Sequence, residues 1–254
     1  MQGGICVIET VYRVAGAPRI ALLSDLHNRL FDAVISSLHS YRPTLIAIAG
    51  DVVTGWYPEN DQSPLETQEN VKPFFSACAD VAPTFFSIGN HEQFLDQQDL
   101  EEISNLGVTV LDNTWIKKDG FVIGGLTSAA STIYRKHKPS GGRYPKLTDK
   151  ITDHAPETAW LADFAAEDGF HILLSHHPEY ISFIPASIEL VLSGHAHGGQ
   201  WRIFNHGIYA PGQGFWPRYT EGLYDGRLVV SAGLANTVSV PRFFNPTQIV
   251  FIEG

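Results

Sequence analysis

The segment IALLSDLH, residues 20–27, indicates the fold class, because four apolar residues run directly into an aspartate and a histidine. Uncharged runs of this length are typical of strands that are buried on both faces of a parallel sheet. Four more such runs occupy residues 45–49, 84–88, 172–174 and 188–192. They lead into Gly-Asp, Gly-Asn-His-Glu, Ser-His-His and Ser-Gly-His-Ala-His, respectively. The sequence therefore predicts buried strands with polar residues just beyond their carboxyl ends.

Helical spacing of apolar residues separates these runs. It occurs at residues 31–40, 71–79, 100–106 and 156–166. The last segment is the clearest, because Trp160, Leu161 and Phe164 are spaced for one buried face and Pro156 stands early. Strands that alternate with helices predict a largely parallel sheet with helices on its outside.

The C-terminal third has a different pattern. Residues 222–234 predict a hairpin around Asp225-Gly226, a pair that favours a type I′ turn. Residues 248–252 predict one last short strand. We therefore expect antiparallel strands beside the parallel core.

Composition and charge limit the classes of protein to consider. A chain of 254 residues that is 44% hydrophobic can form one large α/β domain with a sizeable core. The formal net charge of −10 argues against nucleic-acid binding through a broad basic surface, and against attachment to an anionic membrane leaflet. No feature of the sequence implies a protein partner.

Two cysteines, Cys6 and Cys78, form no CxxC pair, so neither a structural zinc site nor a disulfide framework is expected. A reducing compartment is the simplest interpretation. The first residues lack the basic start and apolar length of a signal peptide, and no window approaches the ~18 apolar residues of a membrane span. We therefore expect a cytoplasmic protein without a transmembrane segment.

Residues 128–150 stand apart, with little apolar periodicity and a strongly basic composition. This segment carries six of the seventeen basic residues of the chain: Arg135, Lys136, Lys138, Arg143, Lys146 and Lys150. One interpretation is a variable, solvated loop near the active site. The other is a loop that approaches an anionic substrate.

The polar residues beyond the strands are the candidate site. In open α/β sheets, ligands bind beyond the carboxyl ends of the strands, so these side chains should meet at one edge. Six of the eleven histidines lie in these segments, which makes chance an unsatisfactory explanation. Carboxylate, imidazole and amide ligands without thiolates suit Mn, Fe or Zn ions. The candidate ligands are Asp25, His27, Asp51, Asn90, His176, His195 and His197.

Seven ligands are too many for one four-coordinate ion, so two ions bridged by a carboxylate fit better. Asp25 and His27, like His195 and His197, are alternate residues, so one loop can supply two ligands. Asp51 follows its own strand alone and is the natural bridging ligand.

The ordered motifs DLH, GD, GNHE, HH and GHAH resemble those of the calcineurin-like metallophosphoesterases. The continuation GGQ, with YAPGQGFWPRYTEGLY and VVSAGL, is similar to the bacterial branch of the YaeI and YkuE phosphodiesterases. The resemblance implies one domain over residues 1–254, a four-layer α/β/β/α sandwich of two mixed sheets flanked by helices. It assigns Asp25, His27, Asp51 and His197 to a first metal ion, and Asp51, Asn90, His176 and His195 to a second.

The resemblance also implies hydrolysis of a small anionic phosphate ester, with diesters favoured, by a metal-bridging hydroxide. We expect His91 to act as general acid on the leaving oxygen; its alternative role is to position other groups. Glu92 either orients His91 or only ends the strand loop. Three other functions stay open: a phosphomonoesterase on the same centre, a non-catalytic scaffold of this fold that binds a protein, and a nuclease. The acidic charge and the absence of a long basic stretch count against the nuclease.

Arg29 and four aromatic residues are candidates for substrate binding. Arg29 lies two residues beyond His27 and could reach a phosphate, although surface arginines are common. Four aromatic side chains could form a pocket wall that stacks on an apolar or aromatic leaving group: Trp201, Trp216, Phe215 and Tyr219. The alternative for these four residues is a place in the core.

Overall fold

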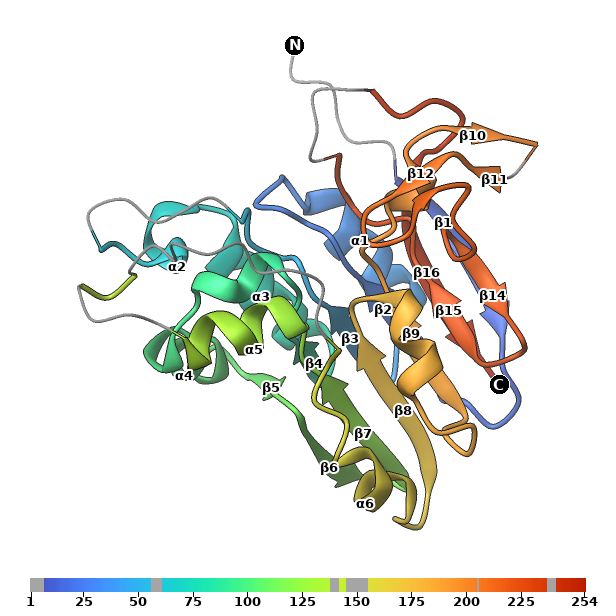
Figure 1. Ribbon diagram of the computed structural model, residues 1–254, viewed down its shortest axis with the longest axis horizontal. Helices are drawn as coiled ribbons and strands as arrows, with labels where there is room; N and C mark the ends of the chain where they lie inside the picture. The colour runs from blue at the N-terminus through green and yellow to red at the C-terminus, as the bar shows by residue number, and fades with distance from the viewer. Residues whose placement is uncertain (1–6, 56–60, 138–141, 145–154, 205, 237–240) are drawn as a thin grey trace.

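The computed structural model describes residues 7–55, 61–137, 142–144, 155–204, 206–236 and 241–254. Two six-stranded mixed sheets lie at its centre (Figure 1). The first has the order β1 (Val7–Arg13), β16 (Thr247–Glu253), β2 (Ile20–Leu23), β3 (Leu45–Ala49), β4 (Thr84–Ser87), β5 (Val108–Leu111). The second has the order β14 (Gly222–Tyr224), β15 (Leu228–Val230), β9 (Leu190–Ser193), β8 (Phe170–Ser175), β7 (Phe121–Leu126), β6 (Thr114–Lys118).

Helices cover the outer faces of the two sheets. They are α1 (Asp32–Tyr41), α2 (Pro64–Thr67), α3 (Val71–Val81), α4 (Gln97–Asn105), α5 (Ala129–Lys136) and α6 (Leu161–Ala165). Three short 3₁₀ helices are η1 (His91–Phe94), η2 (Pro178–Phe183) and η3 (His197–Gly199). Two small hairpins complete the elements: β10 (Arg202–Ile203) with β11 (His206–Gly207), and β12 (Tyr209–Ala210) with β13 (Gly214–Phe215).

Alternation along each central strand explains the four layers. In β2, Ala21 and Leu23 pack with α1 and α3, whereas Ile20 and Leu22 pack between the sheets. In β8, Leu173 faces the α6 side of the second sheet, and its neighbours face the inter-sheet core. Both faces of these strands are buried, so their sequences are continuously apolar. The predicted α/β/β/α sandwich is confirmed.

The parallel core and the antiparallel additions also agree with the sequence. Strands β2, β3, β4 and β5 are parallel, as are β7, β8, β9 and β15. The hairpin of β14 and β15 pairs antiparallel around Asp225-Gly226, and β16 pairs antiparallel with β2.

The helix predicted over residues 156–166 is mostly wrong, because only Leu161–Ala165 is helical. Leu161 and Phe164 are its buried residues, and they supply a single turn of packing. Ala155, Glu157 and Ala159 are exposed, and Pro156 is buried. A short helix without packing is marginal in water, which explains why the helix does not extend backwards.

The loop predicted over residues 128–150 is wrong at its start, where Ala129–Lys136 forms α5. Its buried face includes the polar Ser131 and Thr132, so the sequence showed no apolar periodicity. Tyr134 on this face contacts Phe94 of η1, with ring centroids 5.1 Å apart.

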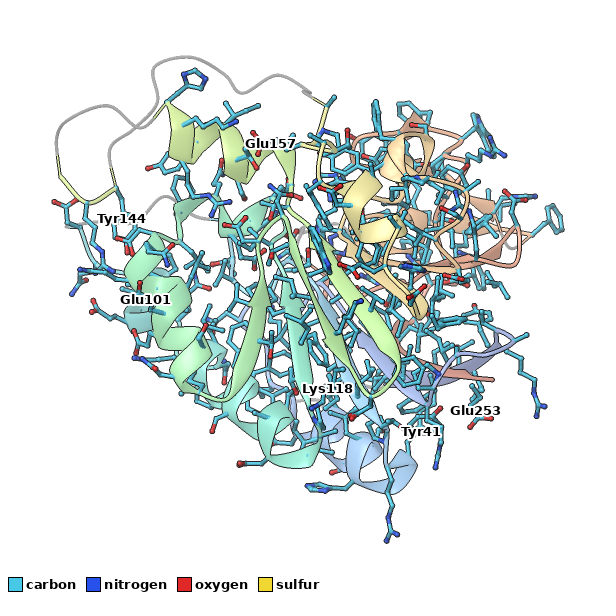
Figure 2. The ribbon with its side chains drawn as sticks, turned by 90° about the horizontal axis from the view of Figure 1, so that it is seen from below. Tyr41, Glu101, Lys118, Tyr144, Glu157 and Glu253 are labelled. Atoms are coloured by element: carbon cyan, nitrogen blue, oxygen red, sulfur yellow. The ribbon has the colours of Figure 1, made fainter. Side chains whose placement is uncertain are left out.

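The basic residues described in this segment are paired with acids of the same chain. Arg135 binds Asp112, and Lys136 at the end of α5 binds Glu157. Figure 2 labels Glu157 close to this helix. Arg143 contacts Asp96 at 2.7 Å and Asp99 at 3.0 Å. These ion pairs give no support to an anion-binding role for the three residues. Lys138, Lys146 and Lys150 lie outside the described residues.

Within the described part of the chain, no helix has the length and apolar character required to cross a bilayer.

Candidate metal centre

The candidate ligands lie just beyond the carboxyl ends of β2, β3, β4, β8 and β9, at one edge of the two sheets. Five of them have left-handed backbone conformations, which residues other than glycine adopt uncommonly. They are Asp25 (φ 57°), His27 (φ 47°), Asp51 (φ 57°), His195 (φ 66°) and His197 (φ 47°). Such strain concentrates at functional sites, where the surrounding structure holds it.

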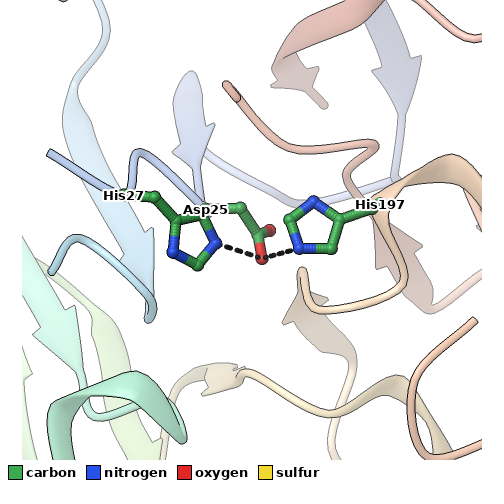
Figure 3. Close-up of side chains that lie close together, drawn as sticks. All are labelled: Asp25, His27 and His197. Carbon is green, nitrogen blue, oxygen red and sulfur yellow. Dashed lines mark ion pairs between the residues drawn. The ribbon is translucent and has the colours of Figure 1, made fainter. Parts of the chain in front are cut away.

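Asp25, His27 and His197 form the first cluster (Figure 3). His27 Nε2 lies 3.8 Å and His197 Nε2 3.5 Å from the same oxygen, Asp25 Oδ1. All three side chains are buried. These separations are too long for strong hydrogen bonds, and they suit donor atoms that converge on an ion.

Asp51, His176 and His195 form the second cluster. His176 Nε2 lies 3.0 Å from Asp51 Oδ2, and His27 Nε2 of the first cluster lies 3.9 Å from that same oxygen. Asp51 therefore faces both clusters. Asn90 lines the same pocket, and its Oδ1 is buried without a hydrogen-bond partner among the described residues.

Backbone carbonyls fix the orientation of two of these histidines. His27 Nδ1 lies 3.2 Å from the oxygen of Val53, and His176 Nδ1 lies 2.6 Å from that of Ala49. A carbonyl only accepts, so Nδ1 carries the proton in both rings. In the neutral rings, the Nε2 lone pairs then point into the clusters, as metal ligation requires.

His91 has the opposite arrangement. The backbone N–H of Gly55 donates to its Nδ1 at 2.6 Å, so in the neutral ring Nε2 carries the proton. This Nε2 lies 3.7 Å from Asp51 Oδ2, and about a third of the side chain is exposed (32%). Burial lowers the pKa of His91 and favours the neutral ring. His91 therefore presents a donor to the pocket rather than a lone pair.

Glu92 does not orient His91. It accepts hydrogen bonds from the backbone N–H groups of Gly89, Asp51, Val52 and Val53, at 2.8 to 3.3 Å. Burial and the charge of Asp51 raise the pKa of Glu92 to about 7. Glu92 therefore links the loop after β3 to the loop after β4. The sequence alone could not choose between the possible roles of this residue.

In the two clusters, the surroundings of Asp51 favour the ionised carboxylate, and those of His195 and His197 favour neutral rings. Burial alone raises the pKa of Asp51, but the charge and hydrogen bond of His176 outweigh it and hold that pKa well below its usual range. Burial lowers the pKa of His195 and lowers that of His197 to about 4. Buried carboxylates beside neutral imidazoles are suited to binding a divalent cation.

A pocket of about 670 Å³ opens above the clusters. Arg29 and Trp201 line it, and their roles in substrate binding stay predictions. Trp216 is 70% exposed and is not among the residues that line this pocket; its role in substrate binding stays a prediction. Phe215, also a candidate from the sequence, lines the pocket, whereas Tyr219 is not among its lining residues. Tyr209 adds apolar wall that was not among the candidates; the long uncharged stretch around it was the available signal.

The model of one protein family, described as Calcineurin-like phosphoesterase, matches residues 18–199, which contain every candidate ligand. The chain belongs to the calcineurin-like phosphoesterase family. Members of this family use divalent metal ions to hydrolyse phosphate esters, and the two clusters suit such ions.

Relatives of this chain occur in bacteria and animals. An uncharacterized metallophosphoesterase of Campylobacter jejuni is 28% identical over 92% of this chain and 56% of its own length. A putative metallophosphoesterase of Caenorhabditis elegans is 26% identical over 94% of this chain and 48% of its own. The uncharacterized protein YpbG of Bacillus subtilis is 29% identical over 79% of this chain and 70% of its own. The chain thus spans about half the length of the first two relatives.

Proposed function

We propose that this phosphoesterase is a dinuclear metal-dependent phosphodiesterase. The observation that carries the proposal is the position of Asp51 Oδ2, which is faced by His176 Nε2 at 3.0 Å and by His27 Nε2 at 3.9 Å. One carboxylate shared by two clusters of buried imidazoles fits a bridged pair of ions. The orphaned Oδ1 of Asn90 supplies a further ligand atom.

The ligands divide between two ions. Asp25, His27, Asp51 and His197 would hold the first ion, and Asp51, Asn90, His176 and His195 would hold the second. Mn, Fe and Zn all accept this mixture of carboxylate, imidazole and amide. When bound, such ions acidify water towards neutral pH and stabilise the charge that develops on phosphate oxygens.

The residues of the chain bind and orient the ester. Arg29, exposed at the pocket, is placed to attract a phosphate oxygen. His91 directs its Nε2–H towards the centre and would act on the leaving oxygen. In the reaction, the oxygen of water forms a bond to phosphorus and that water gives up a proton to solvent; the bond to the leaving oxygen breaks, and the leaving oxygen takes up a proton from solvent. A diester thus becomes a monoester and an alcohol.

His91 acts on the leaving oxygen as a neutral hydrogen-bond donor in this proposal. Full proton transfer would need a second proton on Nδ1, and the N–H of Gly55 already donates to that atom. The predicted general-acid role is the alternative, and pH dependence separates the two.

Diesters are favoured over monoesters because the pocket extends well beyond the clusters and has room for a second organic group. Similarity to the YaeI and YkuE branch supports the same preference. A phosphomonoesterase on the same centre is the second candidate. A non-catalytic scaffold is disfavoured, since every predicted ligand position is filled. We further propose one domain over residues 1–254 and, from the cysteine usage, a cytoplasmic location.

Kinetics on two esters test this proposal. The purified protein should hydrolyse bis-p-nitrophenyl phosphate faster than p-nitrophenyl phosphate, and only after Mn²⁺ is supplied. Faster hydrolysis of the monoester would select the phosphomonoesterase. No turnover of either ester in the metal-loaded protein would leave the scaffold as the better proposal.

A further inference from the structure

Large apolar side chains are exposed on one side of the pocket, on the two small hairpins and on residues 243–244. We call this group the aromatic rim: Trp201, Phe204, Phe215, Trp216, Phe243 and Phe244. Phe204 is 95% exposed, Phe244 89% and Phe215 76%. Figure 1 shows the hairpin elements β10, β11 and β12 together at the upper right. Clusters of this kind on a protein surface mark binding sites.

The rim is continuous with the pocket wall. Trp201 contacts Phe243, with ring centroids 6.0 Å apart, and Phe215 contacts Tyr209 at 5.4 Å. Backbone hydrogen bonds connect the segments that carry these two pairs. The N–H of Ile208 donates to the carbonyl oxygen of Trp201 at 2.8 Å, and the carbonyl oxygen of Ile208 accepts from the N–H of Trp216 at 2.9 Å. Trp201 and Phe215 belong to both the rim and the lining of the pocket. An apolar surface thus leads from solvent towards the metal clusters.

Charge is absent from the sequence of the rim. Residues 203–217 and 243–248 contain no Asp, Glu, Lys or Arg, in a chain that is 17% charged. Arg202, which precedes the first stretch, is 3.1 Å from Glu221. Arg218, just after the first stretch, is exposed, and its guanidinium lies 5.1 Å from the centroid of the Tyr219 ring. The six rim side chains themselves carry no charge, so they offer an ionic partner no complementary group and lose no charge solvation when they enter an apolar phase. Tryptophan beside phenylalanine is suited to the boundary between lipid and water.

We propose that the aromatic rim inserts into an uncharged lipid–water interface and delivers an amphipathic phosphodiester from that interface to the pocket. The substrate class rests on the proposed phosphodiesterase function, whereas the insertion does not. Apolar burial drives the association, which explains how a chain of net charge −10 can bind a membrane without anionic attraction.

Vesicle sedimentation tests the insertion with Mn²⁺-loaded protein and phosphatidylcholine vesicles. The protein should sediment with the vesicles equally at about 0.1 M and about 1 M salt, because screening does not weaken apolar burial. Phe204→Ser/Phe244→Ser should reduce the bound fraction about tenfold. These two rings lie outside the pocket lining, so turnover of soluble methyl p-nitrophenyl phosphate should stay within about twofold. The matched control is Phe183→Ser, which removes a half-exposed phenyl ring outside the rim and should leave sedimentation unchanged.

Hydrolysis of the vesicle phospholipid tests the substrate class. The double variant should lose this activity and keep that on the soluble ester. Wild-type protein that cleaves the soluble ester but does not sediment with the vesicles would overturn the proposal, as would binding that needs anionic lipid and low salt. A dimer that dissociates in the double variant would instead assign the rim to contacts between copies. Sedimentation without turnover of either ester would contradict the phosphodiesterase and leave the insertion supported.

Discussion

The guanidinium of Arg242 lies against the ring of His197, with Nη2 at 3.0 Å from Nδ1. A guanidinium only donates, so Nδ1 is the acceptor, and a neutral His197 carries its proton on Nε2, facing Asp25. To ligate through Nε2, His197 must lose that proton or the contact with Arg242. Arg242 also donates to the backbone oxygen of Ala232 at 2.8 Å, which holds it in place. The arrangement opposes binding of the first ion.

Replacement of Arg242 should therefore tighten the first site. In Arg242→Met the positive charge and the donor are lost, and we expect the affinity for the weaker of two Mn²⁺ ions to rise about tenfold. Isothermal titration of the metal-free protein measures both affinities. Arg135→Met, which breaks the ion pair with Asp112, is the control and should leave them unchanged. Weaker binding in Arg242→Met would show that Arg242 orients His197 as a ligand.

His91 should matter most for esters with poor leaving groups. His91→Ala should keep its metals and lose about 10²-fold in turnover of an alkyl diester, with a smaller loss on p-nitrophenyl esters, whose leaving group needs little assistance. His39→Ala, on the exposed surface of α1, is the control. Near-normal turnover of the alkyl diester by His91→Ala would exclude any action on the leaving oxygen.

The pH profile distinguishes the two roles of His91. Burial lowers its pKa, so the imidazolium that general-acid catalysis requires is lost as pH rises through the acidic range. A neutral Nε2–H donor persists above that range. We expect the kcat of the saturated, metal-loaded enzyme on the alkyl diester to show no fall attributable to His91 between about pH 6 and 8. A fall there that disappears in His91→Ala would establish the general acid.

Metal uptake should release protons, chiefly from His176. Burial lowers the pKa of His176, but the charge of Asp51 at 3.0 Å outweighs that effect and raises it to about 10. The protonated ring therefore stabilises the metal-free fold fully below about pH 6.5, and this contribution is lost as pH rises through about 10. A metal ion must displace this proton, so affinity should rise with pH by up to about tenfold per unit in that window. Calorimetry in buffers of different ionisation enthalpy counts the protons, and pH-independent affinity would contradict the expectation.

Gly89 keeps space for the bridging carboxylate. A Cβ at this position would lie 2.3 Å from Asp51 Oδ1 and 2.8 Å from Glu92 Oε2. Gly89→Ala should therefore displace Asp51 and lower both metal content and turnover by about 10²-fold. The control is Gly120→Ala, where no atom lies within 4 Å but φ is +84°, so only backbone strain is added. Full metal content in Gly89→Ala would show that Asp51 can bind from another position.

Strands buried on both faces were the most predictable elements of the fold. The bounds of Ile20–Leu23 and Leu45–Ala49 agree with the apolar runs residue for residue. Parallel strand ends then bring the ligands to one edge, so residues distant in sequence could be assigned to one centre. Helix α5 could not be predicted in this way, because the polar Ser131 and Thr132 occupy its buried face.

Hydrogen-bond partners were the least predictable part of the site. Spacing cannot tell whether Nδ1 of a histidine meets a carbonyl, as in His176, or an N–H, as in His91. The partners of Glu92 are backbone groups of loops that only the tertiary structure brings together. Arg242 lies far beyond the last ligand motif, and no spacing relates it to His197.

The bridging role of Asp51 is the central claim, and metal stoichiometry by ICP-MS tests it most directly. Wild-type protein loaded with Mn²⁺ and desalted should retain about two ions per chain, and Asp51→Asn should retain fewer than about one, with hydrolysis of bis-p-nitrophenyl phosphate abolished. Asp163→Asn, at an exposed position of α6, is the control and should retain both. Equal metal content in Asp51→Asn and wild type, or wild-type protein that never retains more than one ion, would contradict the dinuclear centre.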